Sequence, residues 1–322
     1  MTGEEAQKMP INPFHPYSPA QDALFANRRR EQSLFRRGLA AGIAPGSAGP
    51  WNIAVLGQWG IGKTSLLRRF TALARAVDSP VGIVNLSATS AFLSFNEFAL
   101  VLLHRIREDL RGHTGWSGRL RDEIVRWEPT VSVGPVPGTR RNDSPGFGVE
   151  ILYAELRRLW EGHLKGNLAA VIFFLDDAQN VTKVDANILL TLRAVFQDLQ
   201  GLGAVFPLVV TGPEDMFEST RDLAEPVTRF FERLPLGPFS REDTREAVTV
   251  PLTAAGHSLR VEEDAVESGI AGRRRGKRAR GAPFAARLRR NSRPRLCSLS
   301  PATRRRRRWR SRSRSPTCRR GS

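Results

Sequence analysis

The sequence predicts an α/β fold in which helices cover both faces of a parallel β-sheet. Between residues 50 and 240, short apolar runs of strand length alternate with longer segments whose apolar residues recur at helical spacing. Strands that helices connect in this way run parallel and are buried on both faces. A glycine-rich loop follows the first apolar run, and a pair of carboxylates ends a later one. The functional interpretation depends on these two features.

The chain before the first strand has two parts. Residues 1–20 are polar and contain four prolines, which predicts an extended lead-in. Residues 21–41 interleave Leu and Phe with arginines, which predicts a helix with one apolar face. A stretch rich in Gly, Pro and Ser at residues 42–50 then links this helix to the first strand.

The glycine-rich loop at residues 57–64 matches the P-loop pattern G-x-x-x-x-G-K-[ST] at every fixed position. An apolar run at residues 53–56 precedes it and a helical pattern follows, so a chance glycine turn is the weaker alternative. Backbone N–H groups of such a loop and the following helix N-terminus bind phosphate oxygens. We expect Lys63 to reach the β- and γ-phosphates and the Thr64 hydroxyl to ligate Mg²⁺. The predicted nucleotide-binding residues are Gly57, Gln58, Trp59, Gly60, Ile61, Gly62, Lys63, Thr64 and Ser65.

The remaining elements follow from the same periodicities. The predicted strands after the loop cover residues 81–86, 171–175, 204–210 and 231–236. The predicted helices cover residues 66–74, 95–110, 151–160, 188–199, 240–255 and 261–270. Residues 111–148 are less regular and end in a loop rich in Pro, Gly and Ser.

Asp176 and Asp177 directly follow the apolar run at residues 171–175. In P-loop proteins an apolar strand beside the phosphate-loop strand presents an Asp that holds Mg²⁺ together with the loop hydroxyl. We assign Asp176 this role, and we expect Asp177 to orient and deprotonate the attacking water. The alternative is that both carboxylates simply begin a turn.

Three further polar residues are candidates for the reaction. Thr211 ends the strand at residues 204–210, where its hydroxyl would lie near the γ-phosphate, or where it is an ordinary strand-end threonine. Arg229 and Arg233 are candidates to stabilise charge in the transition state, either in the same chain or in a neighbouring one.

Two segments resemble base-reading elements of GTPases but are badly placed for that role. Residues 182–185 match [NT]-K-x-D yet follow the acidic strand by only a few residues, and residues 143–146 match D-x-x-G within a proline-rich loop. The sequence therefore favours ATP over GTP.

The basic character of the chain is confined to its end. Residues 271–322 hold 20 Arg and one Lys without any Asp or Glu, so of the total charge of +18 residues 1–270 carry −3. Both cysteines, Cys297 and Cys318, also lie there, and the five histidines are scattered without metal-ligand spacing. The N-terminus is unlike a signal peptide, and no apolar run reaches membrane-spanning length. We expect a soluble cytoplasmic protein with no membrane partner.

Residues 11–270 resemble the origin-recognition-complex-like branch of the AAA+ ATPases, close to the STAND signalling ATPases. Besides the P-loop, the similar segments are residues 12–14, 24–31, 173–179, 210–212 and 236–240. The family's usual Gly-Arg-Glu has a looser version in Ala-Asn-Arg-Arg-Arg-Glu at residues 26–31. The resemblance implies ATP and Mg²⁺ as cofactors, a helical lid, and a site that a neighbouring subunit of a homo-oligomer completes. Asp177 stands where the family more commonly has Glu, which implies slow turnover.

The predicted domain organisation ends in an interrupted lid. A lead-in at residues 1–20 is followed by the P-loop ATPase domain at 21–238, a partial helical lid at 239–270 and an Arg-rich tail at 271–322. A mix of Arg, Ala, Gly, Pro and Ser without acids is typical of a GC-rich coding strand read in the wrong frame, so one hypothesis is a frameshifted substitute for the lid. The other is a genuine basic arm for nucleic acid or an acidic partner. Both predict that the tail is disordered.

The leading functional hypothesis is Mg²⁺-dependent ATP hydrolysis that drives a conformational or signalling switch. A second is a nucleotide-gated binding module with little or no turnover. A third is a DNA-binding, initiator-like protein, although the charge of −3 outside the tail argues against a large phosphate-binding surface there. A metabolic kinase is a remote fourth, because no acceptor site can be identified.

Overall fold

The protein is described by a computed structural model. It describes residues 14, 18–20, 24–44, 51–88, 92, 94–112, 116, 118–129, 147–182, 187–217 and 229–255. All of these belong to one compact unit, Met1–Phe284, and a second unit, Ala285–Ser322, lies outside the described residues.

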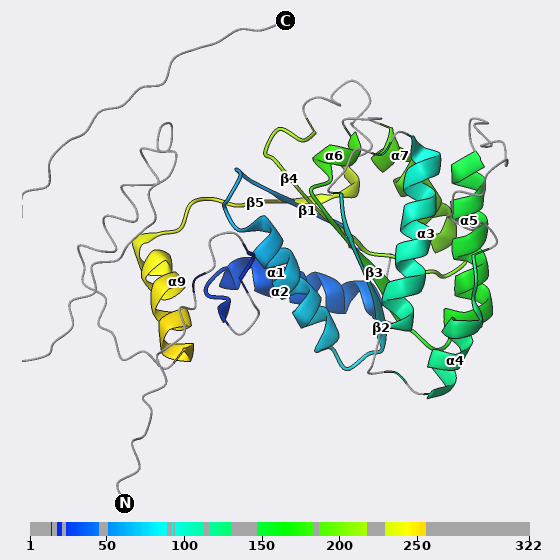
Figure 1. Ribbon diagram of the computed structural model, residues 1–322, viewed down its shortest axis with the longest axis horizontal. Helices are drawn as coiled ribbons and strands as arrows, with labels where there is room; N and C mark the ends of the chain where they lie inside the picture. Colours follow the sequence, from blue (N-terminus) through cyan, green and yellow to red (C-terminus); the bar gives the residue numbers. More distant parts are fainter. Residues whose placement is uncertain are drawn as a thin grey trace, which may run out of the picture. The chain divides into compact units, whose positions relative to one another are not determined.

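The described residues contain one sheet of five strands, all parallel, in the order β2-β3-β4-β1-β5 (Figure 1). The strands are β1 (Ile53–Leu56), β2 (Val81–Ser87), β3 (Ala170–Asp176), β4 (Leu208–Gly212) and β5 (Glu232–Pro235). The helices are α1 (Arg29–Ile43), α2 (Lys63–Arg75), α3 (Phe95–Arg111), α4 (Gly118–Arg126), α5 (Phe147–Leu159), the π-helical turn η2 (Trp160–Leu164), α6 (Gln179–Thr182), α7 (Ile188–Gln200) and α9 (Arg241–Ala254). The α/β fold with a parallel sheet is confirmed.

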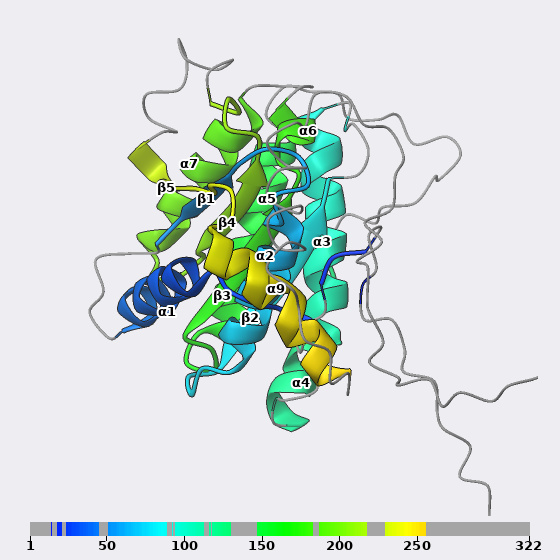
Figure 2. The ribbon, with the colours of Figure 1, turned by 90° about the vertical axis from the view of Figure 1, so that its left-hand side faces the viewer.

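Helices cover the sheet on both faces, as predicted. Successive strand residues point to opposite faces: Phe173 and Leu175 belong to the cluster that includes α3, α5 and α7, whereas Ile172 and Phe174 belong to the cluster that includes α1 and α2. Figures 1 and 2 show these two groups of helices on opposite sides of the strands. Burial on both faces explains why the strands read as continuous apolar runs.

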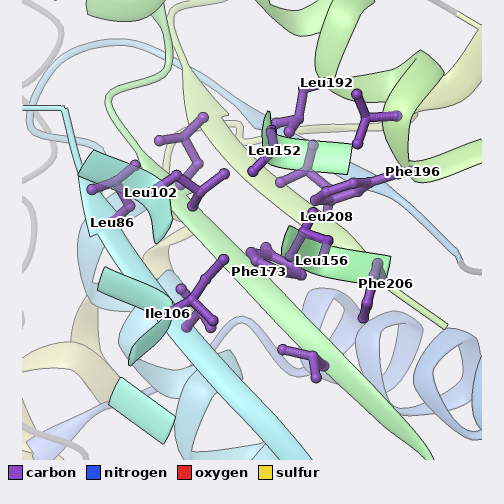
Figure 3. Close-up of a cluster of buried hydrophobic side chains, with 14 of the residues drawn as sticks. Leu86, Leu102, Ile106, Leu152, Leu156, Phe173, Leu192, Phe196, Phe206 and Leu208 are labelled. Atoms are coloured by element: carbon purple, nitrogen blue, oxygen red, sulfur yellow. The ribbon is translucent and has the colours of Figure 1, made fainter. Parts of the chain in front are cut away.

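The larger cluster is rich in aromatic rings. Phe173 lies at its centre, with the ring of Phe196 at 4.9 Å and that of Phe206 at 5.7 Å between centroids (Figure 3). Trp160 meets Phe206 edge-on at 5.5 Å. The strand that ends in Asp176 is therefore fixed by this core.

Several boundaries differ from the sequence prediction. The first helix begins at Arg29 rather than near residue 21, because Asn27 and Arg28 have left-handed backbones with φ of 69° and 56°. The strand predicted over 204–210 begins at Leu208, since Pro207 has no N–H for the ladder. The helices α4 and α6 were not predicted, and the helix predicted at 261–270 lies outside the described residues.

The edge strand β2 is protected by a pair of side chains from α3. The Asn85 N–H donates to Asp109 Oδ2 at 2.7 Å, and Arg105 Nε donates to the Asn85 carbonyl at 2.7 Å. Arg105 and Asp109 also form an ion pair at 2.9 Å. Together they occupy backbone groups that would otherwise be free to pair with another chain.

Burial raises the pKa of Asp109, although the Asn85 N–H and the Arg105 guanidinium oppose the change. A raised pKa in the folded state means that the folded protein holds this proton more tightly than the unfolded chain does. The resulting contribution to stability is fully present below the ordinary pKa of 3.8, and it is lost as pH rises through the folded-state value.

We predict that Asp109→Ala lowers the free energy of unfolding by about 1–3 kcal/mol at neutral pH, because it leaves the Asn85 N–H without an acceptor. The matched control is Glu108→Ala, on the exposed side of the same turn, which should change stability by less than about 0.5 kcal/mol. Urea unfolding measures both. Equal effects from the two variants would contradict the edge-protecting role.

None of the helices in the described part of the chain has the length and apolar character needed to cross a bilayer.

Candidate nucleotide-binding site

The glycine-rich loop connects the end of β1 to the start of α2, as the motif predicts. Its first residue is tied to the neighbouring strand, since the Gly57 N–H donates to the Gly212 carbonyl at 3.1 Å. Gly60 and Gly62 have φ of 76° and 100°, a region that other residues adopt only with strain. These two glycines let the backbone turn tightly enough to direct the start of α2 into the loop.

Lys63 lies inside this loop and is 8% exposed. Its ammonium donates to the carbonyls of Gly57 at 2.8 Å and Gln58 at 3.0 Å. An ammonium has three hydrogens, so these two bonds fix its position and leave one hydrogen for a ligand. Burial lowers the pKa of Lys63, while Asp177, Asp176 and Glu214 act in the opposite direction. The lysine and these carboxylates are thus close enough to interact.

The two carboxylates and Thr211 form a hydrogen-bonded group at the ends of β3 and β4. The Thr211 hydroxyl is fully buried, donates to Asp176 Oδ1 at 2.5 Å and accepts from the Asp177 N–H at 2.9 Å. Asp177 has a left-handed backbone with φ of 56°, which is uncommon for a residue other than glycine. A hydroxyl has one hydrogen, and in this structure that hydrogen is directed at Asp176.

One expectation about this strand is wrong. The strand that ends in Asp176 does not lie beside the phosphate-loop strand, because β4 lies between β3 and β1. Periodicity predicts strands but not their neighbours. The carboxylates nevertheless lie near the loop, because the carboxyl ends of parallel strands meet at one edge of the sheet. Both carboxylates interact electrostatically with the Lys63 ammonium.

The other predicted loop residues differ in accessibility. Trp59 is 94% exposed, Gln58 is exposed and the Thr64 side chain is half-buried. The Ser65 hydroxyl accepts from the Ala20 N–H at 3.1 Å, so the lead-in contacts the start of α2.

Arg28 connects three segments and was not among the predicted site residues. Its guanidinium donates to the Gly237 carbonyl at 2.9 Å and to the Ile61 carbonyl of the P-loop at 3.5 Å, and it lies 4.5 Å from the Phe239 ring centroid. The only sequence signal for it is the loose Gly-Arg-Glu match. Local sequence patterns could not predict this contact, because Arg28 and Gly237 are 209 positions apart.

The helix α9 begins as predicted, with Ser240 as its N-cap. The Ser240 hydroxyl accepts from the Asp243 N–H at 3.1 Å, and Asp243 Oδ2 accepts from the Ser240 N–H at 2.9 Å, which completes a capping box. Burial raises the pKa of Asp243, but hydrogen bonds from Ser240 and Asn27 outweigh it, so the pKa is lowered overall. Arg29 pairs with Glu246 at 2.7 Å, which links α1 to α9.

The candidate arginines lie on the far side of β1 from the carboxylates. Arg233 is on β5, with its guanidinium 5.2 Å from the Phe217 ring centroid, and Arg229 lies just before that strand. Of the two segments that resemble GTPase elements, residues 143–146 and 183–185 lie outside the described residues.

We predict that Thr211→Val lowers the free energy of unfolding by about 1–3 kcal/mol, because it removes the hydroxyl that donates to Asp176 Oδ1 and leaves the Asp177 N–H with only its longer contact to Asp176 Oδ1, at 3.2 Å. Thr211→Ser keeps the hydroxyl and should retain most of that stability. Chemical denaturation of both variants provides the measurement. If the two are equally stable, the hydroxyl does not hold the carboxylates.

Comparison with known proteins gives one family. The sequence profile described as "AAA domain" matches residues 49–218. A search of curated proteins finds no match. Similar solved structures include the ORC2 protein of Aeropyrum pernix in ADPNP-ADP complexes, at 17% identity and a TM-score of 0.48, covering 73% of this chain and 55% of that one. Another is Cdc6p of Pyrobaculum aerophilum, at 19% identity and a TM-score of 0.44, covering 73% and 54%.

A third structure, a Walker-type ATPase of Pyrococcus abyssi, is 14% identical with a TM-score of 0.45, covering 78% of this chain and 67% of that one. The chain thus spans about half the length of the first two structures that it matches. The family profile covers more than half of the 322 residues and includes both the P-loop and the carboxylate strand. The chain belongs to the AAA domain family.

Proposed function

We propose that this protein binds ATP with Mg²⁺ and hydrolyses it to drive a conformational switch, in the manner of the origin-recognition-complex-like AAA+ ATPases. The observation that carries the proposal is the convergence of Lys63, Asp176 and Asp177 at one edge of the sheet. Membership of the AAA domain family supports nucleotide binding. We propose in addition that the protein hydrolyses the nucleotide and that hydrolysis drives a switch.

The residues present suit the triphosphate. The loop from Gly57 to Ser65 offers backbone N–H groups and the N-terminus of α2, which favour phosphate oxygens. Lys63 has its remaining hydrogen for the β- and γ-phosphates.

The residues present also suit Mg²⁺, whose preferred ligands are oxygens. Asp176 Oδ1 accepts the Thr211 hydrogen, which leaves Oδ2 as a ligand, and the half-buried Thr64 hydroxyl supplies a second oxygen. When bound, Mg²⁺ would neutralise charge on the phosphates. We assign Thr64 and Asp176 as its ligands.

Asp177 is the proposed general base, which orients a water and accepts its proton. Hydrogen bonds hold its backbone at both the N–H and the carbonyl, so the position from which its side chain extends is fixed. Arg229 and Arg233 lie on the far side of β1 from the carboxylates in this chain, and they are the candidates to stabilise charge during phosphoryl transfer, in this site or in that of a neighbouring copy.

The second candidate is a nucleotide-gated module with little turnover. The side chain of Asp177 is one methylene shorter than the Glu common in the family, which reduces its reach toward a water beside the nucleotide and favours slow turnover.

Binding and turnover can be separated on the wild-type protein. Trp59 is exposed within the loop, so its fluorescence should change when Mg-ATP binds, and Trp59→Phe should lose the signal while keeping the affinity. Phosphate release is then measured with ATP and with GTP. Binding with release supports the ATPase, binding without release supports the gated module, and absence of binding rejects both.

Any binding of nucleic acid is proposed only through residues 271–322. Deleting them is the test, because affinity that disappears with the tail and falls steeply with salt reflects nonspecific electrostatics.

A further inference from the structure

We infer that Gln179 is a positioning residue that sets the orientation of the Asp177 carboxylate. Gln179 Nε2 donates to Asp177 Oδ1 at 3.1 Å. The inference rests on the proposed hydrolysis, in which Asp177 is the base, and it adds a residue that acts through Asp177 rather than on the nucleotide.

The backbone of Gln179 is fixed by its neighbours. The Ala178 N–H donates to the Thr211 carbonyl at 2.9 Å, which ties the start of α6 to β4. Asn180 Nδ2 donates to the Ala88 carbonyl at 2.7 Å, which ties α6 to the segment after β2. Ala178 and Val181 are fully buried. Gln179 therefore extends from a short helix that is anchored to two different parts of the sheet.

The backbone of Asp177 is fixed as well. Its N–H lies 2.9 Å from Thr211 Oγ1 and 3.2 Å from Asp176 Oδ1, and its carbonyl accepts from the Asn180 N–H at 2.9 Å. These bonds hold the left-handed backbone conformation at φ of 56°. Such conformations persist only where the surroundings determine them, and they are concentrated at functional sites.

With both backbones fixed, the carboxylate retains freedom only in its side-chain rotation. The hydrogen bond from the Gln179 amide to Oδ1 restricts that rotation and leaves Oδ2 to accept from a water. A base is effective only within a narrow range of distances and angles, and misplacement by about 1 Å can cost on the order of 100-fold in rate. The amide is neutral, so it orients the carboxylate without adding a charge beside Lys63.

The test is a double-mutant cycle between Gln179→Leu and Asp177→Asn. Gln179→Leu should slow phosphate release by about 10- to 100-fold at saturating Mg-ATP and leave the Kd for Mg-ATP unchanged. In the Asp177→Asn background it should produce no further slowing, because the group through which it acts is gone. Single-turnover release with enzyme in excess makes the slow variants measurable.

The matched control is Gln197→Leu, the same substitution at an exposed position of α7, which should not change release. Gln179→Met, which keeps the length of the side chain and its neutrality but removes the donor, should behave like Gln179→Leu and provides a second variant if the first does not fold. Equal slowing by Gln179→Leu in both backgrounds, or normal release by it alone, would overturn the inference. A wild-type protein that releases no phosphate would instead overturn the proposed hydrolysis, and the role of Gln179 with it.

Discussion

The Asp177→Asn variant should bind Mg-ATP as wild type does and release phosphate on the order of 100- to 1,000-fold more slowly. Asn has the size and shape of Asp but cannot accept a proton from water. The backbone bonds that hold residue 177 involve its N–H and carbonyl, so the substitution leaves them in place. Isothermal titration gives the affinity, and single-turnover phosphate release gives the rate.

Glu214→Gln is the matched control for that experiment. Glu214 is exposed just after β4 and interacts electrostatically with Lys63, as Asp177 does, but it belongs to no hydrogen-bonded group at the strand ends in the described structure. Its amide variant should release phosphate at nearly the wild-type rate. Similar losses in the two variants would mean that the effect is the removal of a charge near Lys63. Normal release by Asp177→Asn would place the base elsewhere.

The Phe173→Ala variant should lower the free energy of unfolding by about 3–5 kcal/mol. Phe173 is 3% exposed on β3, and its ring contacts those of Phe196 and Phe206, which also contact each other. Removing its ring loses apolar contacts and leaves a cavity that the surrounding sheet and helices cannot close completely. Urea denaturation, with the slope of the transition checked for two-state behaviour, measures the loss.

Two comparisons support the interpretation of that loss. Phe173→Leu retains most of the buried volume and should lose less than half as much stability. Val125→Ala removes an apolar side chain that is 48% exposed on α4 and should change stability by less than about 0.5 kcal/mol. A small effect of Phe173→Ala would mean that this aromatic cluster is not the core that supports β3.

The parts of the fold that depend on local sequence were predictable. Strands buried on both faces appear as continuous apolar runs, and β1, β2 and β3 were found in this way. The P-loop was recognisable because its phosphate-binding chemistry needs fixed residue types at fixed spacing. Ser240 was correctly predicted as a cap because capping is a bond across three residues.

The parts that depend on contacts between distant segments were not predictable. Nothing in the periodicity of residues 171–175 or 208–212 indicates that β4 lies between β3 and β1. The contact of Arg28 with Gly237 joins residues at opposite ends of the domain. Asp177 and Thr211 were candidates from sequence, but the hydroxyl that joins Thr211 to Asp176 becomes apparent only once the two strands are paired.

The hypotheses about the end of the chain stay predictions. Residues 256–322 lie outside the described residues, so the lid boundary at 270 and the frameshift are untested by the structure. Sequencing the gene addresses the frameshift: if a one-base shift near codon 270 restores no helical continuation, that hypothesis is wrong.

The central claim is a functional P-loop, and thermal unfolding with and without Mg-ATP tests it most directly. A ligand that binds only the folded state stabilises it by RT ln(1 + [L]/Kd), about 2.7 kcal/mol at a hundredfold excess over Kd. Wild type should unfold at a higher temperature with Mg-ATP, Lys63→Ala should lose that increase, and Lys165→Ala, at an exposed lysine, should keep it. No increase for wild type, or an equal increase for Lys63→Ala, would contradict nucleotide binding at this loop.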